Sequence, residues 1–166
     1  QATSNGIGYS PDDRKNKGLI LGMSVRDNLT IPIMKRIISV SKLSNFAKQI
    51  IERLNIVTPS EKTMVRKLSG GNQQKVIIGR LVLSNQKVII LAFPTRGVDV
   101  GAKREIYSLI RELAEKDTAI ILMGDSFEED IGLSNRIVTL KDGKCTGIIN
   151  AEEKKPNLEE LAEYIL

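Results

Sequence analysis

Apolar positions along the chain follow two different periods, and their alternation predicts a mixed α/β protein. From Leu43 to Leu54 the apolar residues have the i, i+3, i+4 spacing of one helix face. The runs 88–91 and 118–123 are instead short, apolar throughout and rich in β-branched residues, which predicts strands buried on both faces of a parallel sheet. Strand, helix, strand in this order implies a right-handed parallel crossover. The stripe of the intervening helix is formed by Ile106, Leu109, Ile110, Leu113 and Ala114.

Turn and capping residues mark where these elements begin and end. Residues 6–9 predict a short strand that runs into a Ser-Pro-Asp-Asp turn. Asp142-Gly143 lies between the strand-like segments 136–140 and 144–149 and is a strong hairpin signal. Residues with short polar side chains precede four helical segments, and we expect them to act as N-caps. They are Ser24, Ser69, Asp99 and Asn157.

The composition is that of one ordinary globular domain, with 166 residues, 41% of them hydrophobic and 27% charged. A single cysteine, Cys145, permits no internal disulfide, and the absence of histidine excludes His-based catalysis and a zinc site. No apolar run reaches the roughly 18 residues of a membrane span, and no signal peptide opens the sequence. We therefore expect a soluble protein. It begins with Gln1 rather than Met, which suggests a piece excised from a longer polypeptide.

Charge is distributed unevenly between the two halves. Residues 1–87 hold 15 Lys or Arg against 5 Asp or Glu, whereas residues 88–166 hold 10 against 15. A basic half is compatible with nucleic-acid binding, but aromatic residues are only 4% and the basic residues cluster in nothing longer than pairs such as Lys35-Arg36. A solvated face, or a face turned toward nucleotide phosphates, is therefore favoured over nucleic acid.

One stretch, Leu-Ser-Gly-Gly-Asn-Gln-Gln-Lys at 68–75, stands directly before the apolar helical run 76–82. Ser69 occupies the N-cap position, and the unpaired N–H groups of a helix N-terminus favour a phosphate. Two adjacent glycines indicate backbone that approaches another group, not packing. A bare Ser-Gly-Gly is most typical of a plain helix cap. The whole octet, however, resembles the signature motif of ATP-binding-cassette (ABC) ATPases, in the version typical of sugar-importer subunits.

A second motif supports this resemblance. Residues 88–103 are similar to the Walker B strand, the Pro-Thr-Arg-Gly turn and the D-loop of the family, in the same order and spacing. Where the family has Asp and then Glu, this sequence has Ala92 and Phe93, which can neither bind magnesium nor orient water. Asp125 falls at the position of the family's switch histidine, and no G-x-x-x-x-G-K-[ST] motif occurs. The resemblance therefore implies no catalytic residues and no ATPase activity in the isolated chain.

The fold implied by the resemblance is a partial P-loop NTPase (ABC ATPase) fold. It consists of a parallel sheet with flanking helices, a C-terminal β-hairpin and a mostly helical subdomain. Residues 1–24 correspond to a Q-loop-like segment, 25–87 to the helical subdomain with the signature helix, and 88–166 to the C-terminal part of the α/β core. Because the strand and helix of the phosphate cradle would precede Gln1, we expect a sheet with an unpaired edge or an exposed apolar face, and self-association as its remedy.

The implied function is that of the second nucleotide-binding half of a sugar- or nucleoside-importer ATPase. In such dimers the signature of one half closes over ATP bound to the opposite half, with Mg²⁺ present only in the full assembly. Asp12 falls in the Q-loop, where it either reaches a metal-bound water or forms a plain Asx turn. The implied cofactor-binding residues are Ser69, Gly70, Gly71, Gln73, Asp99 and Asp12.

The implied partners are the opposite nucleotide-binding half and transmembrane permease subunits. They place the protein in the cytoplasm, peripherally at the inner face of the plasma membrane. An alternative from another class remains open, in which the chain is a non-catalytic interaction module whose helical subdomain docks on a membrane partner.

Overall fold

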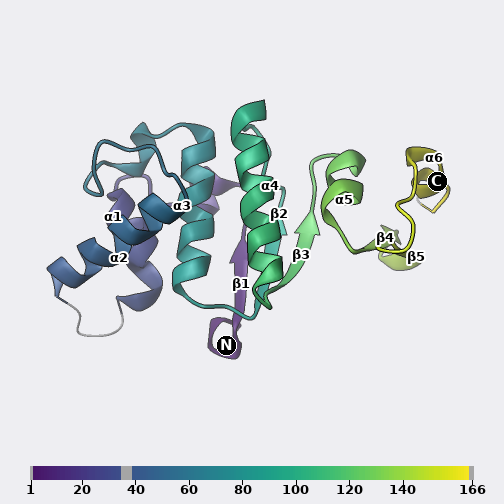
Figure 1. Ribbon diagram of the computed structural model, residues 1–166, viewed down its shortest axis with the longest axis horizontal. Coiled ribbons are helices and arrows are strands. Elements are labelled where there is room, and N and C mark those ends of the chain that lie inside the picture. Colours follow the sequence, from purple (N-terminus) through teal and green to yellow (C-terminus); the bar gives the residue numbers. More distant parts are fainter. Residues whose placement is uncertain (1, 35–38, 165–166) are drawn as a thin grey trace. The chain divides into compact units, whose positions relative to one another are not determined.

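The computed structural model describes residues 2–34 and 39–164. The chain divides into two compact units, Gln1–Ile121 and Leu122–Leu166, each held together by its own contacts. The first unit contains the helical region and the signature segment, and the second contains the hairpin (Figure 1).

The sheet joins strands that are far apart in sequence. Its strands are β1 (Ile7–Ser10), β2 (Val88–Ala92) and β3 (Ala119–Met123), in the spatial order β1-β2-β3. Strands β1 and β2 are parallel, with Ile7 opposite Val88 in the register. The predicted strands at 6–9 and 88–91 are thereby confirmed, and β2 occupies the centre of the sheet.

The prediction that 118–123 is buried on both faces is wrong. In β3 the side chains of Ile121 and Met123 are 54% and 41% exposed, whereas Ile89 and Leu91 in the central strand are buried. The difference follows from position, because β3 is an edge strand among the described residues. An apolar sequence indicates that a strand can be buried on both faces. It carries no information on which elements lie beside that strand. The expected exposed apolar face is found at this edge.

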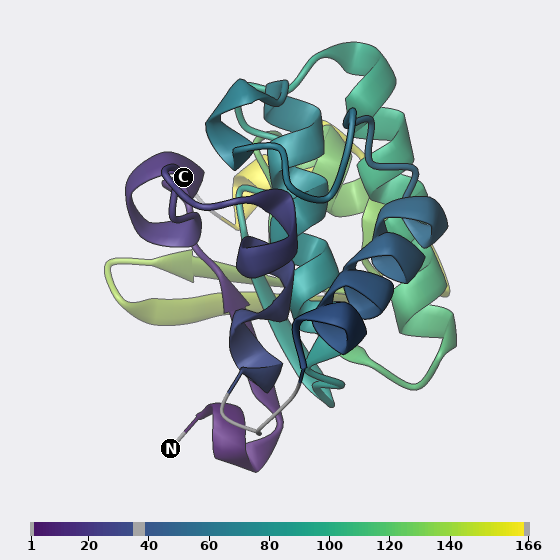
Figure 2. The same ribbon diagram turned by 90° about the vertical axis from the view of Figure 1, so that its left-hand side faces the viewer.

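Helices of the first unit pack on one another beside the sheet. Helix α1 contacts both α2 and α3, and α3 lies next to α4 (Figures 1 and 2). The described residues of the segment 25–87, expected to form a helical subdomain, are mostly helical. The α-helices of this unit are α1 (Val25–Thr30), α2 (Val40–Arg53), α3 (Gly70–Leu83) and α4 (Val100–Glu115), and its short helices are η1 (Thr3–Asn5), η2 (Arg14–Gly18, a π-helix), η3 (Ile31–Ile33) and η4 (Val65–Lys67).

All four predicted N-caps are confirmed. In each case the side-chain oxygen accepts a hydrogen bond from the backbone N–H three residues further along. Each such cap stabilises its helix by about 0.5–2 kcal/mol. The helix starts at 25, 70, 100 and 158 are therefore fixed by local chemistry.

The core of the first unit lies where α1, α2 and α3 meet. Leu29 and Ile77 are among its fully buried side chains. Arg80 of α3 enters the same region and donates to carbonyl oxygens, at 2.9 Å to Asn28 and at 2.7 Å to Gly18. Burial lowers the pKa of this guanidinium. Arg80 thus ties the signature helix both to α1 and to the segment that follows β1.

Helix α4 buries most of its predicted stripe. Ile106, Ile110 and Leu113 are buried, but Ala114 is exposed, so the prediction fails at that position. Ala114 lies at the C-terminal end of the helix, and burying its single methyl group would gain little free energy. An i, i+4 ion pair lies at the end of the helix, with 2.6 Å between Lys116 Nζ and Glu112 Oε1.

The second unit is built on a hairpin of β4 (Arg136–Lys141) and β5 (Lys144–Asn150), which pair antiparallel. Both turn residues, Asp142 and Gly143, have positive φ, as the tight two-residue turn requires. The predicted hairpin is therefore confirmed. Two further helices, α5 (Phe127–Leu133) and α6 (Leu158–Glu163), belong to this unit, whose small core is formed by Ile137, Ala151 and Leu161.

Throughout the described residues, no helix combines the length and the apolar character that crossing a bilayer demands.

Candidate functional site

The signature segment forms the first turn of α3. The exposed Ser69 side chain accepts hydrogen bonds from the backbone N–H of Asn72, at 3.4 Å, and from Asn72 Nδ2, at 2.9 Å. Asn72 Oδ1 in turn accepts from the backbone N–H of Val57 at 2.8 Å. The start of the helix is consequently anchored to the loop that precedes it, and its N-terminal end is presented at the surface.

The two signature glycines serve different purposes. A Cβ on the buried Gly71 would lie 2.5 Å from the Cβ of Ala102, so this glycine allows α3 to pack against α4. The expectation that neither glycine is required for packing is wrong for Gly71. At Gly70 a Cβ would lie 2.7 Å from Arg14 Nη2 and 3.0 Å from the carbonyl oxygen of Gly97. Gly70 is therefore the glycine at which backbone closely approaches another segment.

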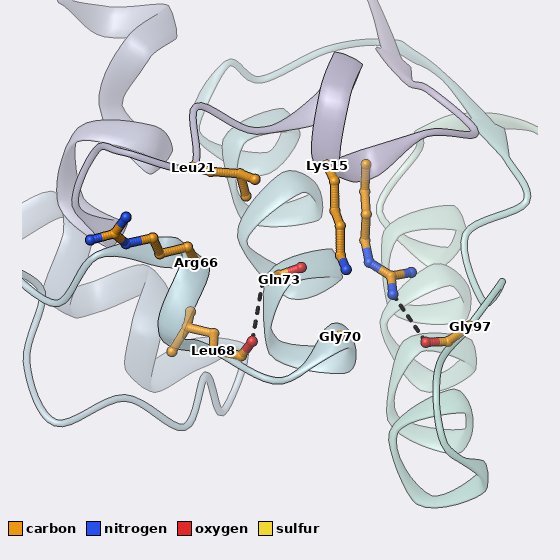
Figure 3. A pocket seen from close by; sticks show the side chains of 8 residues that line it. Lys15, Leu21, Arg66, Leu68, Gly70, Gln73 and Gly97 are labelled. Carbon is orange, nitrogen blue, oxygen red and sulfur yellow. Dashed lines mark hydrogen bonds between the residues drawn. The ribbon is translucent and has the colours of Figure 1, made fainter.

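Arg14 joins the segment after β1 to the loop after β2. Its Nη2 donates to the carbonyl oxygen of Gly97 at 3.0 Å, drawn as a dashed line in Figure 3, and its Nη1 donates to the carbonyl oxygen of Arg96. These acceptors are neutral, so the positive charge of Arg14 is not cancelled by them. Gly97 has a φ of 64°, a conformation that favours glycine.

Gln73 forms an inner wall of the site and is only 4% exposed. Its Nε2 donates to the carbonyl oxygens of Val65 and Leu68, at 3.3 and 3.2 Å. Because carbonyl oxygens only accept, these contacts fix the orientation of the amide and turn Oε1 the other way. Buried Oε1 finds no hydrogen-bond partner within the described part of the chain.

These groups surround a pocket of about 310 Å³ (Figure 3). Three of the lining side chains are cationic and none is acidic. The N-terminus of α3 adds partial positive charge at Gly70. The pocket is therefore chemically suited to an anion with several oxygen atoms. Its lining residues are Arg14, Lys15, Leu21, Arg66, Leu68, Gly70, Gln73 and Gly97.

Four of the six predicted site residues do not line this pocket. Ser69 and Gly71 are sequence neighbours of lining residues at the start of α3, whereas Asp99 and Asp12 belong to other segments. Asp99 is exposed and caps α4 by accepting from the backbone N–H of Ala102 at 3.0 Å. Asp12 is exposed and lies 3.2 Å from Lys17 Nζ, and this hydrogen bond lowers the pKa of its carboxyl group. The Asx cap in this turn is made by Asp13, which accepts from the backbone N–H of Asn16 at 3.1 Å.

The structure thus places Gly70 and Gln73 in the pocket wall, with Ser69 and Gly71 beside them in the same turn. The three cations were not predicted as site residues. Their only sequence signal is the basic character of the two segments 14–17 and 66–67, which does not reveal that the segments meet.

At the end of β2, Ala92 is buried and Phe93 has a φ of 49°. The guanidinium carbon of Arg96 lies 3.9 Å from the centroid of the Phe93 ring, within cation–π range. No group of three or more potential metal ligands occurs among residues 2–34 and 39–164. The residues at this strand end do not fit a magnesium ion, whereas those of the pocket fit phosphoryl oxygens.

Comparison with known proteins assigns the chain to a family. The profile of the ABC transporter family matches residues 1–96, more than half of the sequence. The chain belongs to the ABC transporter family.

Its relatives include the ATP-binding proteins of sugar importers. The ribose import ATP-binding protein RbsA of Lactococcus lactis subsp. cremoris is 44% identical over 98% of this chain and 34% of that protein. The galactose/methyl galactoside import ATP-binding protein MglA of Pasteurella multocida is 40% identical over 100% of this chain and 34% of that protein. The chain spans about one third of the length of these relatives.

A solved structure shares the fold. The ATP-binding cassette MJ0796, determined as a dimer in a post-hydrolysis state bound to ADP and Pi, superposes with a TM-score of 0.76 at 22% identity. The match covers 89% of this chain and 63% of the other. The predicted α/β fold of the ABC ATPase type, with its parallel sheet, flanking helices and hairpin, is confirmed.

Proposed function

We propose that this chain is part of the ATP-binding subunit of a carbohydrate or nucleoside importer, and that its signature segment completes the ATP site of the opposite nucleotide-binding half. One observation carries the proposal. The exposed start of α3, with Ser69 and Gly70, borders a pocket lined by cations and by no acid. Such a surface favours phosphoryl oxygens that a second protein surface presents to it.

In this proposal the chain's own site is degenerate. Hydrolysis requires an acid for magnesium and a group that orients water, and Ala92 and Phe93 provide neither. ATP and Mg²⁺ are held by the opposite half, and the isolated chain has no ATPase activity. Asp99 and Asp12, which lie outside the pocket, act in the D-loop and the Q-loop segment respectively.

The experiment substitutes Ser69→Glu in a protein that pairs this chain with an opposite nucleotide-binding half. A negative side chain at the start of α3 repels phosphate, so we expect turnover to fall at least tenfold, the effect of about 1.4 kcal/mol in the barrier. Ser39→Glu is the matched control. Ser39 caps α2, which is 14 residues long like α3. No residue of α2 lines the pocket, whereas Ser69 stands between the lining residues Leu68 and Gly70.

Both substitutions should leave the fold intact, since a cap contributes about 0.5–2 kcal/mol and Glu retains an acceptor. Thermal melts of both variants check this. Normal turnover in Ser69→Glu contradicts the proposal, as does tight magnesium-dependent binding of ATP to the isolated chain.

A second candidate is a module that docks on a membrane partner without contributing to hydrolysis. Large apolar side chains exposed in the helical region favour it, among them Met23, Val40, Phe46 and Val57. A Phe46→Ser variant that loses binding to the permease subunits, combined with normal turnover in Ser69→Glu, would select this candidate over the first. In both, the chain acts in the cytoplasm at the inner face of the membrane.

A further inference from the structure

We propose that the pocket beside the signature segment binds the phosphoryl oxygens of a polyphosphate directly through Lys15 and Arg66, two cations outside the signature octet. The proposal deepens the function proposed above by assigning two further contact residues to the same site. It concerns binding by this chain alone, so it can fail or succeed independently of turnover in a paired protein.

The charges of Lys15 and Arg66 are not neutralised by acidic side chains of the described residues. Among the described residues, the side chains of Lys15 and Arg66 have no hydrogen bond or ion pair. Other cations of this unit differ. Lys17 lies 3.2 Å from Asp12, and the buried Lys75 forms an ion pair with Glu105 and donates to the carbonyl oxygen of Asn55 at 2.7 Å. Lys15 and Arg66 are thus cations without an acidic partner that line the same pocket.

The wall of the pocket behind these two side chains is held in place by contacts between segments. Arg14 is held by the carbonyl oxygens of residues 96 and 97, which fixes its position while leaving its charge uncompensated. Gly70 brings the N-terminus of α3 against the same loop. Lys15 and Arg66 therefore extend over a wall that is already positive and pre-organised, which reduces the entropic cost of binding an anion.

Gln73 points to a ligand independently of the charges. Its Oε1 is a buried acceptor without a donor among the described residues, and such a group costs free energy until it is satisfied. Figure 3 shows this oxygen turned toward the side of the pocket where Lys15 is drawn. The Lys15 ammonium has three N–H donors, so one can serve Gln73 while the others serve phosphoryl oxygens. Binding of an anion that holds Lys15 in this position would thereby also give the buried Gln73 Oε1 a hydrogen-bond donor.

The test uses inorganic tripolyphosphate as the probe, without magnesium and at low salt, and follows backbone amide resonances of the chain. We expect saturable shifts centred on Lys15, Gly70 and Gly97. Lys15→Ala and Arg66→Ala should each weaken binding about three- to tenfold, because each removes one close charge. Arg66→Lys should retain most of the affinity.

Lys67→Ala is the matched control. Lys67 is adjacent to Arg66 and exposed, but it does not line the pocket, and we expect less than a twofold change. ATP should bind no more tightly than tripolyphosphate.

Three outcomes would overturn the proposal. The first is an equal loss of affinity in Lys67→Ala, which would indicate diffuse electrostatics. The second is shifts that scatter over the surface or never saturate, which would indicate an adventitious ion only. The third is ATP binding more than tenfold tighter than tripolyphosphate, which would mean that the base, and not the phosphates, is recognised.

Discussion

The two units of the molecule differ in how far each can bury its own apolar residues. The first unit has a core in which side chains from α1, α2 and α3 are fully enclosed, together with buried polar ties such as Arg80. Among the described residues, the core of the second unit has three buried side chains, and its hairpin leaves Val138, Leu140 and Ile148 exposed. A segment of this size has little interior, so its stability depends more on what covers it.

This difference shows why the pocket is found where it is. Positioning charged groups requires neighbours that do not move, and the first unit supplies them through contacts between segments that are far apart in sequence, as between Arg14 and Gly97. In the second unit the polar contacts are mostly local, such as the capping box of Asn157 and Glu160. Four predictions test the comparison, in order of decreasing effect.

Glycines of the two units should respond in opposite ways to a methyl group. Gly71→Ala should destabilise the first unit by about 1–3 kcal/mol, because its Cβ would overlap that of Ala102. Gly132 lies in α5 of the second unit, and a Cβ added there would meet no atom within 4 Å. Gly132→Ala should therefore raise the free energy of unfolding by up to about 1 kcal/mol. Chemical denaturation measures both. Adding Ala102→Gly should restore the unfolding free energy lost in Gly71→Ala. If the loss persists in the double variant, the overlap with Ala102 is not its cause.

Restoring the missing acids should cost stability without creating an ATPase. Ala92 is buried, so in Ala92→Asp with Phe93→Glu the new carboxylate lacks a guaranteed partner, which costs about 1–3 kcal/mol. The second change also removes the ring that Arg96 stacks on. Phosphate release should stay at the buffer background while the melting temperature falls. Turnover that scales with protein concentration and survives repurification would contradict this prediction.

Exposed apolar surface should make the chain self-associate. Val138 and Ile148 are paired directly across the hairpin and are both exposed, and Ile121 adds an apolar side chain on β3. Val138→Thr with Ile148→Thr should reduce association in sedimentation and binding of an apolar dye. The change in unfolding free energy should stay within about 0.5 kcal/mol, as for other surface substitutions. A strictly monomeric parent chain that binds no dye would refute the prediction.

The smallest effect is expected at the link between α2 and α4. Hydrogen bonds from Lys116 and then from Arg53 lower the pKa of Glu112. Since the folded pKa lies below the unfolded one, this stabilisation is present above the unfolded value and is lost as pH falls through the folded value. Both cations are exposed, so Glu112→Gln should cost at most about 0.5–1 kcal/mol at neutral pH. Melting curves of the two proteins should converge in acid; a constant difference would exclude the ion pairs as its cause.

Local features of the fold were predictable from sequence, because their causes are local. Capping residues such as Ser69 and the Asp142-Gly143 turn act within four residues, and the helical period of 43–54 identified α2. Motif spacing also identified the family.

Features that depend on distant segments were not predictable. The role of Gly71 depends on Ala102, and the exposure of Ile121 depends on which elements lie beside β3. The pocket is the clearest case. Lys15 and Arg66 are separated by about 50 residues, and no periodicity or motif in the sequence indicates that they share one cavity.

The way in which Arg14 holds the loop after β2 has a consequence for tolerance to mutation. Arg14 donates its hydrogen bonds to the main-chain oxygens of residues 96 and 97. Position 96 is therefore free to vary as far as this contact is concerned, since every amino acid offers the same carbonyl group. The positive φ at position 97 favours glycine there. Position 14 requires an arginine, whose planar guanidinium donates to two carbonyl oxygens at once. Among sequences that share this loop, the Arg14 contact itself should tolerate changes at position 96, whose side chain stacks on Phe93, but not the loss of Arg14.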